Sequence, residues 1–265
     1  MIDDTYVFCF QSQKGGVGKT TLACHFARAI TWYGKPTILI DTDPQGSAQD
    51  WMAAREEESP FPVVGFTRDK LHKDIRQIVN GYKFAIIDSP PRTTQVARSA
   101  LLCSDALIIP LSPSVLDVWA LSDTLQLVDE AKEYNESLKI GIAINREIGN
   151  TQISKAVDKE LQKTGIKVFE SHIKQRVAYA EVMGIGKTVM EVEPEGVAAM
   201  DFLNLFIEVV EWSEGHFRYA NPRDHYRDSV RPYLGQSNLK SRLIAEYKVM
   251  ARRLKRIGEM DDEGR

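Results

Sequence analysis

The sequence predicts an α/β fold in which a mostly parallel, twisted sheet is flanked by helices. Three observations support this fold class. Continuous apolar runs of five or six residues recur along the chain, as expected of parallel strands buried on both faces. Stretches with apolar residues at helical spacing alternate with these runs. A glycine-rich loop joins the first run to the first helix, which makes a strand–helix–strand unit with two parallel strands.

The expected elements follow one another in βα order. Apolar, β-branched runs predict strands at residues 6–10, 37–41, 84–88, 106–111 and 140–145. Helical spacing predicts helices at residues 20–33, 94–103, 115–135, 152–164 and 195–212. Gly34 supplies the stop that is expected after the first helix. These elements together predict one domain over residues 1–212.

The chain changes character after residue 212. Residues 213–265 carry twelve Lys and Arg against eight Asp and Glu, whereas residues 1–212 carry 22 against 29. Residues 238–257 place apolar side chains at spacings of three and four, with basic residues on the other faces. We expect a C-terminal extension, residues 213–265, that ends in a basic amphipathic helix. This helix could dock on the domain or bind nucleic acid or a partner; membrane binding is less favoured, because the apolar stripe lacks Trp and Phe.

Composition excludes several classes of protein. The net charge of −3 means that any contact with nucleic acid must be local. No apolar stretch approaches the roughly 20 residues needed to span a bilayer. No basic segment precedes the first strand, which argues against secretion and for a cytoplasmic protein. Cys9, Cys24 and Cys103 form no CxxC pair, so we expect buried free thiols.

The loop after the first strand predicts a nucleotide site. Lys19 can reach the β- and γ-phosphates of a nucleotide, the Thr20 hydroxyl can bind Mg²⁺, and Thr21 is placed for the α-phosphate. Glycines allow backbone N–H groups to surround phosphate oxygens, and the helix that follows adds its partial positive charge. Asp88 ends an apolar strand, where a carboxylate can hold Mg²⁺ through water. The sequence therefore predicts ATP and Mg²⁺ as cofactors, with the nucleotide held by Gly15, Gly16, Val17, Gly18, Lys19, Thr20 and Thr21.

The same loop resembles the deviant Walker A motif of the ParA/MinD family of P-loop NTPases. Gln13 stands where the first glycine of the ordinary motif would be, and a second lysine, Lys14, follows it. The resemblance implies an ATPase that forms an ATP-dependent homodimer, in which Lys14 reaches across to the phosphates of the partner's ATP. A cation at that place would stabilise both the dimer and the charge that develops in phosphoryl transfer.

Further segments carry the resemblance over residues 5–212. Residues 41–46 are similar to the Walker A′ segment, which implies that Asp43 orients the attacking water and that Asp41 supports the metal and the switch region. Residues 88–91 are similar to Walker B followed by switch II. Asn145 falls where the family reads the adenine edge, although an isolated Asn at a strand end is more often a cap.

Within the family, the sequence looks like a short plasmid-type ParA protein. That resemblance implies partition of plasmid or chromosomal DNA, in which the ATP dimer binds DNA non-specifically on the nucleoid and a centromere-binding adaptor stimulates hydrolysis. Such DNA binding depends on surface cations and falls steeply with salt. The arginines of the C-terminal extension are a second set of candidates. The first set of candidate DNA contacts, each more often a solvated charge when taken singly, is Lys163, Lys167, Lys174, Arg176 and Lys187.

Two alternatives remain open, and a third is disfavoured by the positions of the cysteines. The same cycle could position a protein cargo such as a microcompartment. A MinD-like division-site ATPase could instead be recruited to the membrane through the C-terminal extension. A nitrogenase-reductase-like electron carrier would need thiolates at the dimer interface for a cluster. Cys24 lies inside the first helix and Cys103 ends another helix, so neither favours that third alternative.

Overall fold

A computed structural model describes residues 2, 4–92, 94–149 and 152–213. The basic amphipathic helix predicted at residues 238–257, and with it nearly all of the predicted extension, lies outside the described residues. Within them the chain forms one seven-stranded sheet in the order β3-β2-β4-β1-β5-β6-β7. All six strand pairs are parallel. The predicted α/β fold with a parallel sheet is thus confirmed.

The predicted strands all occur, and two short edge strands are added. The edge strands have three and two residues, too few for an apolar run to stand out in the sequence. Their bounds are set by pairing with a longer neighbour rather than by their own composition. The strands are β1 Tyr6–Phe10, β2 Thr37–Asp41, β3 Val63–Gly65, β4 Phe84–Asp88, β5 Ala106–Leu111, β6 Lys139–Ile144 and β7 Lys167–Val168.

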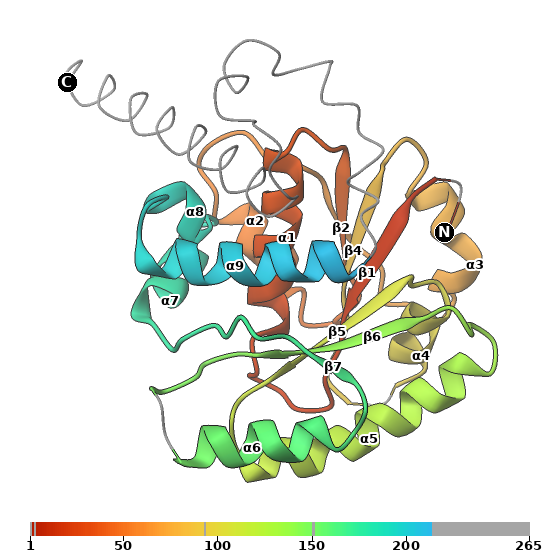
Figure 1. Cartoon of the computed structure of the whole chain (residues 1–265). Coiled ribbons are helices and arrows are strands. Elements are labelled where there is room, and N and C mark those ends of the chain that lie inside the picture. Colours follow the sequence, from red (N-terminus) through yellow and green to blue (C-terminus); the bar gives the residue numbers. More distant parts are fainter. Residues whose placement is uncertain (1, 3, 93, 150–151, 214–265) are drawn as a thin grey trace, which may run out of the picture.

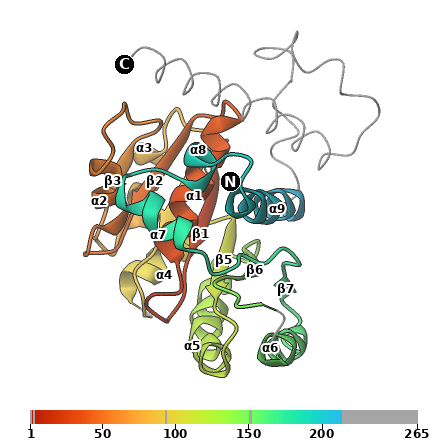
Figure 2. The same cartoon turned by 90° about the vertical axis from the view of Figure 1, so that its left-hand side faces the viewer.

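Helices cover both faces of the sheet (Figure 1 and Figure 2). One face packs against α1, α2, α7, α8 and α9, and the other against α3, α4, α5 and α6. The sequence analysis did not predict α2, α3, α7 or α8, none of which exceeds eight residues. The bounds are α1 Lys19–Trp32, α2 Ser47–Ala53, α3 Leu71–Ile78, α4 Gln95–Leu102, α5 Val115–Lys132, α6 Gln152–Gln162, α7 Val177–Gly184, α8 Val189–Val192 and α9 Val197–Trp212.

The two faces of β1 have different side chains and so define two cores. Phe8 and Phe10 point to the face covered by α1 and α9, where they contact Phe26 of α1. Val7 and Cys9 point to the opposite face, which is mostly aliphatic. Because successive side chains in a strand alternate between faces, one short run supplies both cores. This explains why β1 is apolar at every position.

A buried ion network joins three helices on the first face. Glu191 of α8 accepts hydrogen bonds from Arg28 of α1 at 2.7 Å and from Arg55, which follows α2, at 2.9 Å. Its second oxygen accepts from the backbone N–H and the hydroxyl of Thr188, both at 2.9 Å. Burial alone would raise the pKa of Glu191, but the two arginines outweigh burial and lower the pKa. This carboxylate therefore stabilises the folded state while it is ionised.

Replacing Glu191 with Gln should destabilise the fold in a pH-dependent way. We expect a loss of about 3 kcal/mol near neutral pH, because two buried guanidinium groups lose their anion. A lowered folded-state pKa means that this contribution is present above the ordinary Glu pKa of 4.5 and is lost as the pH falls through the folded-state value. Urea unfolding should therefore show wild type and variant converging in stability as the pH falls below about 4.

The matched control is Glu211→Gln, a change of the same kind at an exposed position of α9. This control should lie within about 0.5 kcal/mol of wild type at every pH. A constant difference between Glu191→Gln and wild type across the pH range would show that packing, and not charge, is what Glu191 contributes.

Candidate nucleotide-binding site

The loop between β1 and α1 has the geometry of a phosphate cradle. Gly16 and Gly18 have φ angles of 78° and 93°, a region that side chains with a Cβ rarely adopt. A Cβ on Gly18 would also lie 2.3 Å from Nδ2 of Asn145. Gly18 is the N-cap of α1, and no side chain caps this helix. The first N–H groups of α1 are therefore left for an anion.

Three hydrogen bonds from other parts of the chain hold the cradle in shape. The Gln13 N–H donates to the Thr124 hydroxyl of α5 at 3.1 Å, and the Arg92 N–H donates to the Gln13 carbonyl at 3.1 Å. The Asn145 side chain donates to the Val17 carbonyl at 2.7 Å. Sequence reasoning missed Thr124 and Arg92, because neither lies in a recognisable motif. The expected contact of Asn145 with adenine stays a prediction. Its side-chain amide also supports the loop through the hydrogen bond to the Val17 carbonyl.

The register of the sheet places Asp88 directly beside the cradle. Phe10 of β1 and Asp41 of β2 are both register partners of Asp88. The Asp88 side chain is buried, and neither of its carboxylate oxygens accepts a hydrogen bond from the described residues. Burial raises the pKa of Asp88 to about 7, and Asp41 adds to this increase, while Thr20 and Lys19 oppose it. A buried carboxylate without partners is costly unless a ligand completes it.

A magnesium ion fits the donors at this place. Asp88 offers two unused oxygens, and the Thr20 hydroxyl lies close enough to lower the pKa of that carboxyl. Among the described residues, no group of three or more His, Cys, Asp and Glu side chains could hold a metal ion. Mg²⁺ is commonly bound by one or two protein groups together with water and substrate phosphates. Thr20 and Asp88 would hold the ion in that way.

Lys19 lies inside the cradle. Its side chain is buried, and its ammonium group donates to the Lys14 carbonyl at 3.3 Å. Burial lowers the pKa of Lys19, while the nearby Asp88 and Asp43 carboxylates oppose that effect. The ammonium group therefore lies folded back on the loop, where it can turn to the phosphates of a bound nucleotide.

Asp41 and Asp43 shape the loop after β2. Asp41 is fully buried and accepts hydrogen bonds from the N–H groups of Asp43, Ala48 and Gln49 at 2.9–3.2 Å. It thereby fixes both this loop and the start of α2, a structural role that sequence reasoning missed. Asp43 is half-buried and accepts from the Gln45 N–H at 3.0 Å. The metal role of Asp41 and the water-orienting role of Asp43 stay predictions.

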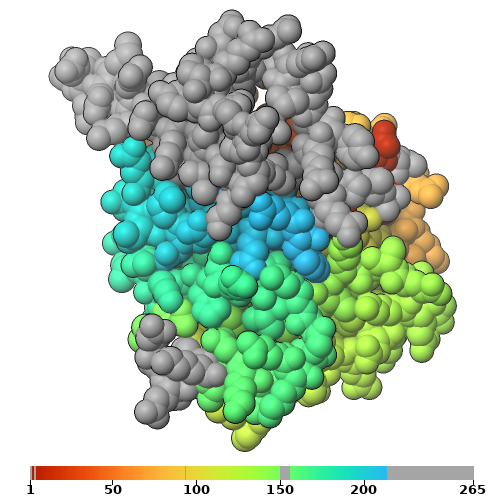
Figure 3. Space-filling model, in the orientation of Figure 1, coloured from red at the N-terminus to blue at the C-terminus, as the bar shows by residue number. Residues whose placement is uncertain are grey.

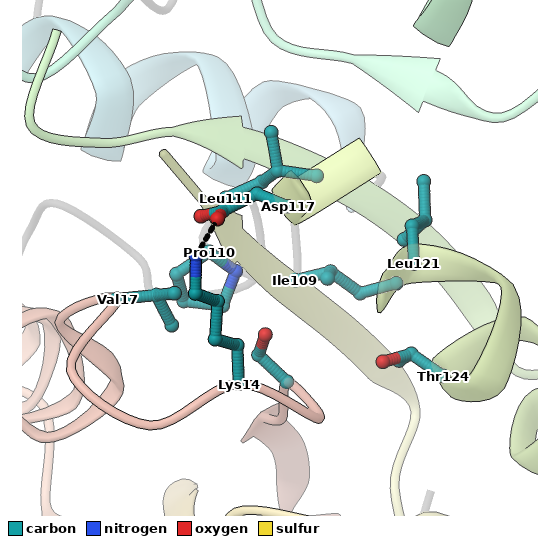
Figure 4. Close-up of a pocket in the computed structure, with 9 residues that line it drawn as sticks. Lys14, Val17, Ile109, Pro110, Leu111, Asp117, Leu121 and Thr124 are labelled. Carbon is teal, nitrogen blue, oxygen red and sulfur yellow. Dashed lines mark hydrogen bonds and ion pairs between the residues drawn. The ribbon is translucent and has the colours of Figure 1, made fainter. Parts of the chain in front are cut away.

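Lys14 has a different environment from Lys19. Its ammonium group forms an ion pair with Asp117 in the first turn of α5, and Figure 4 shows the two side chains meeting beside the end of β5. The Lys14 side chain is 43% exposed, whereas that of Asp117 is 3% exposed. Asp117 also accepts from the Ser112 N–H at 3.1 Å and the Ser114 hydroxyl at 2.8 Å. Lys14 therefore points away from its own cradle, and the carboxylate that holds it has other donors.

The five predicted DNA contacts do not share one environment. They lie in the turn that follows α6, in β7, in the segment between β7 and α7, and in the segment before α8. Each one pairs with a carboxylate of the described chain, an arrangement that sequence reasoning did not foresee. A role for these residues in binding DNA stays a prediction. The pairs are Lys163–Glu160 at 2.6 Å, Lys167–Glu208 at 3.0 Å, Lys174–Glu147, Arg176–Asp201 at 2.8 Å and Lys187–Glu57 at 2.5 Å. Figure 3 shows the face of the molecule on which α6 and α9 lie.

The three cysteines are buried free thiols, as predicted. Cys9 and Cys103 lie in the core on one face of the sheet, and Cys24 lies in the core on the other. Burial raises the pKa of Cys103 to about 12 and raises those of Cys9 and Cys24 as well. Thiols with such high pKa values are unreactive near neutral pH.

Residues 8–189 match the family model described as the CobQ/CobB/MinD/ParA nucleotide binding domain. The chain is 26% identical over 200 residues to the maintenance of carboxysome distribution protein A of Halothiobacillus neapolitanus, covering 74% of this chain and 92% of that protein. It is 27% identical over 231 residues to the chromosome-partitioning ATPase Soj of Thermus thermophilus, covering 75% and 93%.

A likeness in fold extends to solved structures. Cobyrinic acid a,c-diamide synthase from Mycobacterium smegmatis, with a bound ATP analogue and magnesium, superposes with a TM-score of 0.66 at 18% identity. The match covers 80% of this chain and 96% of that one.

Among the residues that the structure describes, no helix has the length and apolar character to cross a membrane.

The Asp88→Asn variant should separate stability from ligand binding. We expect the nucleotide-free variant at pH 8 to be as stable as wild type, or more stable by roughly 1–3 kcal/mol, because it removes a buried charge whose oxygens accept no hydrogen bond from the described residues. The stabilisation by Mg-ATP, about 2.7 kcal/mol at 100 times the dissociation constant, should be largely lost. Thermal unfolding with and without Mg-ATP measures both effects.

Asp129→Asn, at an exposed position of α5, is the matched control and should keep the stabilisation by Mg-ATP. A nucleotide-free Asp88→Asn protein that is several kcal/mol less stable than wild type would contradict the assignment, since Asp88 would then have a structural partner.

Proposed function

The chain belongs to the CobQ/CobB/MinD/ParA nucleotide-binding domain family and is a P-loop ATPase of the ParA type, and we propose that it partitions DNA as an ATP-dependent homodimer. The observation that carries this proposal is the placement of Lys14. A lysine that served its own nucleotide would turn into the cradle beside Lys19. Lys14 instead lies partly exposed on Asp117, outside the cradle, where it can reach a second molecule.

In this proposal, the two lysines of the loop act on different nucleotides. Lys19 and the N–H groups of α1 bind the phosphates of their own ATP, and Lys14 binds those of the partner's ATP. Asp43 orients the attacking water. Magnesium, when bound to Thr20 and Asp88, neutralises charge on the phosphates. Because Lys14 of each protomer helps to complete the nucleotide site of the other, hydrolysis requires the dimer. Loss of the γ-phosphate then allows the dimer to dissociate.

The DNA part of the proposal is supported by the likeness to a chromosome-partitioning ATPase over 93% of that protein's length. We propose that the ATP dimer binds plasmid or chromosomal DNA non-specifically on the nucleoid in the cytoplasm. A centromere-binding adaptor would then stimulate hydrolysis and release the dimer from DNA. The release follows from the cycle, because ADP lacks the γ-phosphate that Lys14 of the partner binds.

One specific observation favours a second candidate function. The likeness to a carboxysome distribution protein covers 92% of that relative. The same ATP cycle could therefore position a protein cargo, with an adaptor on the cargo in place of one on a centromere. A membrane-recruited ATPase stays a prediction, and its proposed anchor, residues 238–265, lies outside the described residues.

Sedimentation velocity with Mg-ATP, with Mg-ADP and without nucleotide tests the proposal. The Asp43→Ala variant, which should bind ATP without hydrolysing it, is compared with wild type. We expect a dimer with Mg-ATP alone, persistent in Asp43→Ala, that binds non-specific duplex DNA in low salt. A dimer that ignores DNA would favour the protein cargo, and a permanent monomer would overturn the assignment of Lys14.

Changing Asp117 should alter the concentration of ATP needed for dimer formation. In Asp117→Asn the ion pair with Lys14 is removed, whereas the amide oxygen can still accept from Ser112 or Ser114. We expect half-maximal dimer formation at a several-fold lower ATP concentration, because Lys14 no longer has to leave an anion. Lys14→Ala should abolish the ATP-dependent dimer. Light scattering during ATP titration measures both effects.

Asp129→Asn, in the same helix and exposed, is the matched control and should behave as wild type. If Asp117→Asn instead weakened the dimer as Lys14→Ala does, then Asp117 would orient Lys14 for the partner rather than restrain it.

A further inference from the structure

A cluster of exposed cations surrounds the start of α3. Arg68, Lys70, Lys73 and Arg76 are all exposed, and we call them the α3 basic face. None of the four has a carboxylate oxygen of the described residues within 4.0 Å. The five cations predicted from the sequence all have such a partner. The α3 basic face can therefore bind another anion without first breaking an ion pair.

The segment that carries the α3 basic face is positively charged, whereas the domain as a whole is negatively charged. Residues 66–83 carry five Lys and Arg against two Asp, a net of +3, while residues 1–212 carry a net of −7. Figure 1 and Figure 2 show α3 at the periphery of the molecule, remote from α6. The local excess of positive charge is thus on the outer surface, where a large polyanion can reach it.

The spacing of the cations suits a row of phosphates. Lys70, Lys73 and Arg76 follow one another at three-residue steps, which keeps them on one side of the helix. At 1.5 Å per residue they extend over about 9 Å. Duplex DNA carries one phosphate per roughly 3.4 Å of axis on each strand. A single strand therefore offers enough phosphates along this length for every cation.

A membrane surface fits these residues less well. The apolar residues of α3, Leu71 and Ile75, are fully buried against the sheet. None of the exposed large hydrophobic residues of the described chain lies within residues 66–83. A helix that binds at a lipid interface needs an apolar face to insert. A binding surface made of cations alone is typical of contact with a nucleic-acid backbone.

This face is also connected to the nucleotide site. The Phe66 N–H donates to the Asp41 carbonyl at 2.7 Å, and the Asp41 carboxylate accepts from the Asp43 N–H at 3.1 Å. The Arg68 guanidinium lies 5.1 Å from the centre of the Phe66 ring. Asp41 and Phe66 thus form a continuous chain of contacts between the loop that carries Asp43 and the start of the α3 basic face.

We propose that the α3 basic face is the surface through which the protein binds the phosphate backbone of duplex DNA. The inference rests on the proposed function, because it names the surface that the ATP dimer would use. Each protomer contributes one copy, so dimer formation doubles the number of phosphate contacts and strengthens DNA binding. The contacts are with phosphates only, and binding is accordingly independent of base sequence.

The test compares two triple variants of the full chain. In the first, Lys70, Lys73 and Arg76 are replaced by Gln. In the matched control, Lys132, Lys139 and Lys159, which belong neither to the α3 basic face nor to the five candidate contacts, are replaced by Gln, which removes the same number of positive charges. Binding of Mg-ATP-loaded protein to a random-sequence DNA duplex is followed by fluorescence anisotropy over a series of salt concentrations. Thermal unfolding, ATP-dependent dimer formation and ATPase activity without DNA confirm that each variant is folded.

We expect the affinity of the first variant to fall at least about tenfold, and its salt slope to flatten by about 0.9 for each phosphate that the variant no longer neutralises. The control variant should bind as wild type does. If the first variant bound DNA with unchanged affinity and slope, this surface would be refuted while DNA binding by wild type still supported the proposed function. An ATP dimer of wild type without DNA binding would overturn both the DNA part of the proposed function and this inference.

Vesicles of phosphatidylglycerol provide a second arm. One outcome would overturn the inference in favour of a membrane surface. In that outcome wild type sediments with the vesicles, the first variant does not, and the first variant still binds DNA. Absence of sedimentation, together with the expected fall in DNA binding, would support the DNA assignment.

Discussion

The parallel register of β1, β2 and β4 is the constraint on which the nucleotide site depends. Because Asp88 pairs with both Phe10 and Asp41, three strands end at one level, and each delivers one part of the site. β1 leads into the phosphate cradle, β2 into the loop of Asp43, and β4 ends on the buried carboxylate. A shift of one residue in β4 would turn Asp88 to the opposite face of the sheet, away from the cradle. The apolar residues that fill both cores hold this register in place. The packing of the sheet therefore also fixes the position of the Asp88 carboxylate.

The parts of the fold that the sequence predicted are those determined by local pattern. β1, β2, β4, β5 and β6 are buried on both faces and so appear as unbroken apolar runs. α8, by contrast, has four residues, and its Glu191 bonds to Arg28 and Arg55, which are 163 and 136 positions away. A helix whose stability comes from such distant partners leaves little periodicity in its own sequence. The same holds for β7, which exists because β6 lies beside it.

The site divides in the same way. Gly18, Lys19 and Thr20 lie within one loop, and Asp88 ends a strand, so their chemistry could be predicted from spacing. The contacts of Lys14 with Asp117 and of Gln13 with Thr124 join positions more than a hundred residues apart, and only the packing of α5 against the loop brings them together. The choice of DNA contacts failed to anticipate pairing for a related reason. A sequence gives the charge of Lys187, but it does not show that Glu57 lies 2.5 Å from the ammonium group and pairs with it.

The opposed directions of Lys14 and Lys19 follow from the shape of one loop. Lys19 donates to the backbone carbonyl of Lys14, so that carbonyl points into the cradle while the Lys14 side chain leaves it. Lys14 then lies against a carboxylate that is 3% exposed, where little water screens the pair. To reach a partner's phosphate, Lys14 has to exchange one anion for another, and only a nucleotide with enough negative charge makes that exchange favourable. A γ-phosphate supplies that charge and ADP does not. The selectivity of the proposed dimer for ATP therefore comes from the competition between Asp117 and the third phosphate for the same ammonium group.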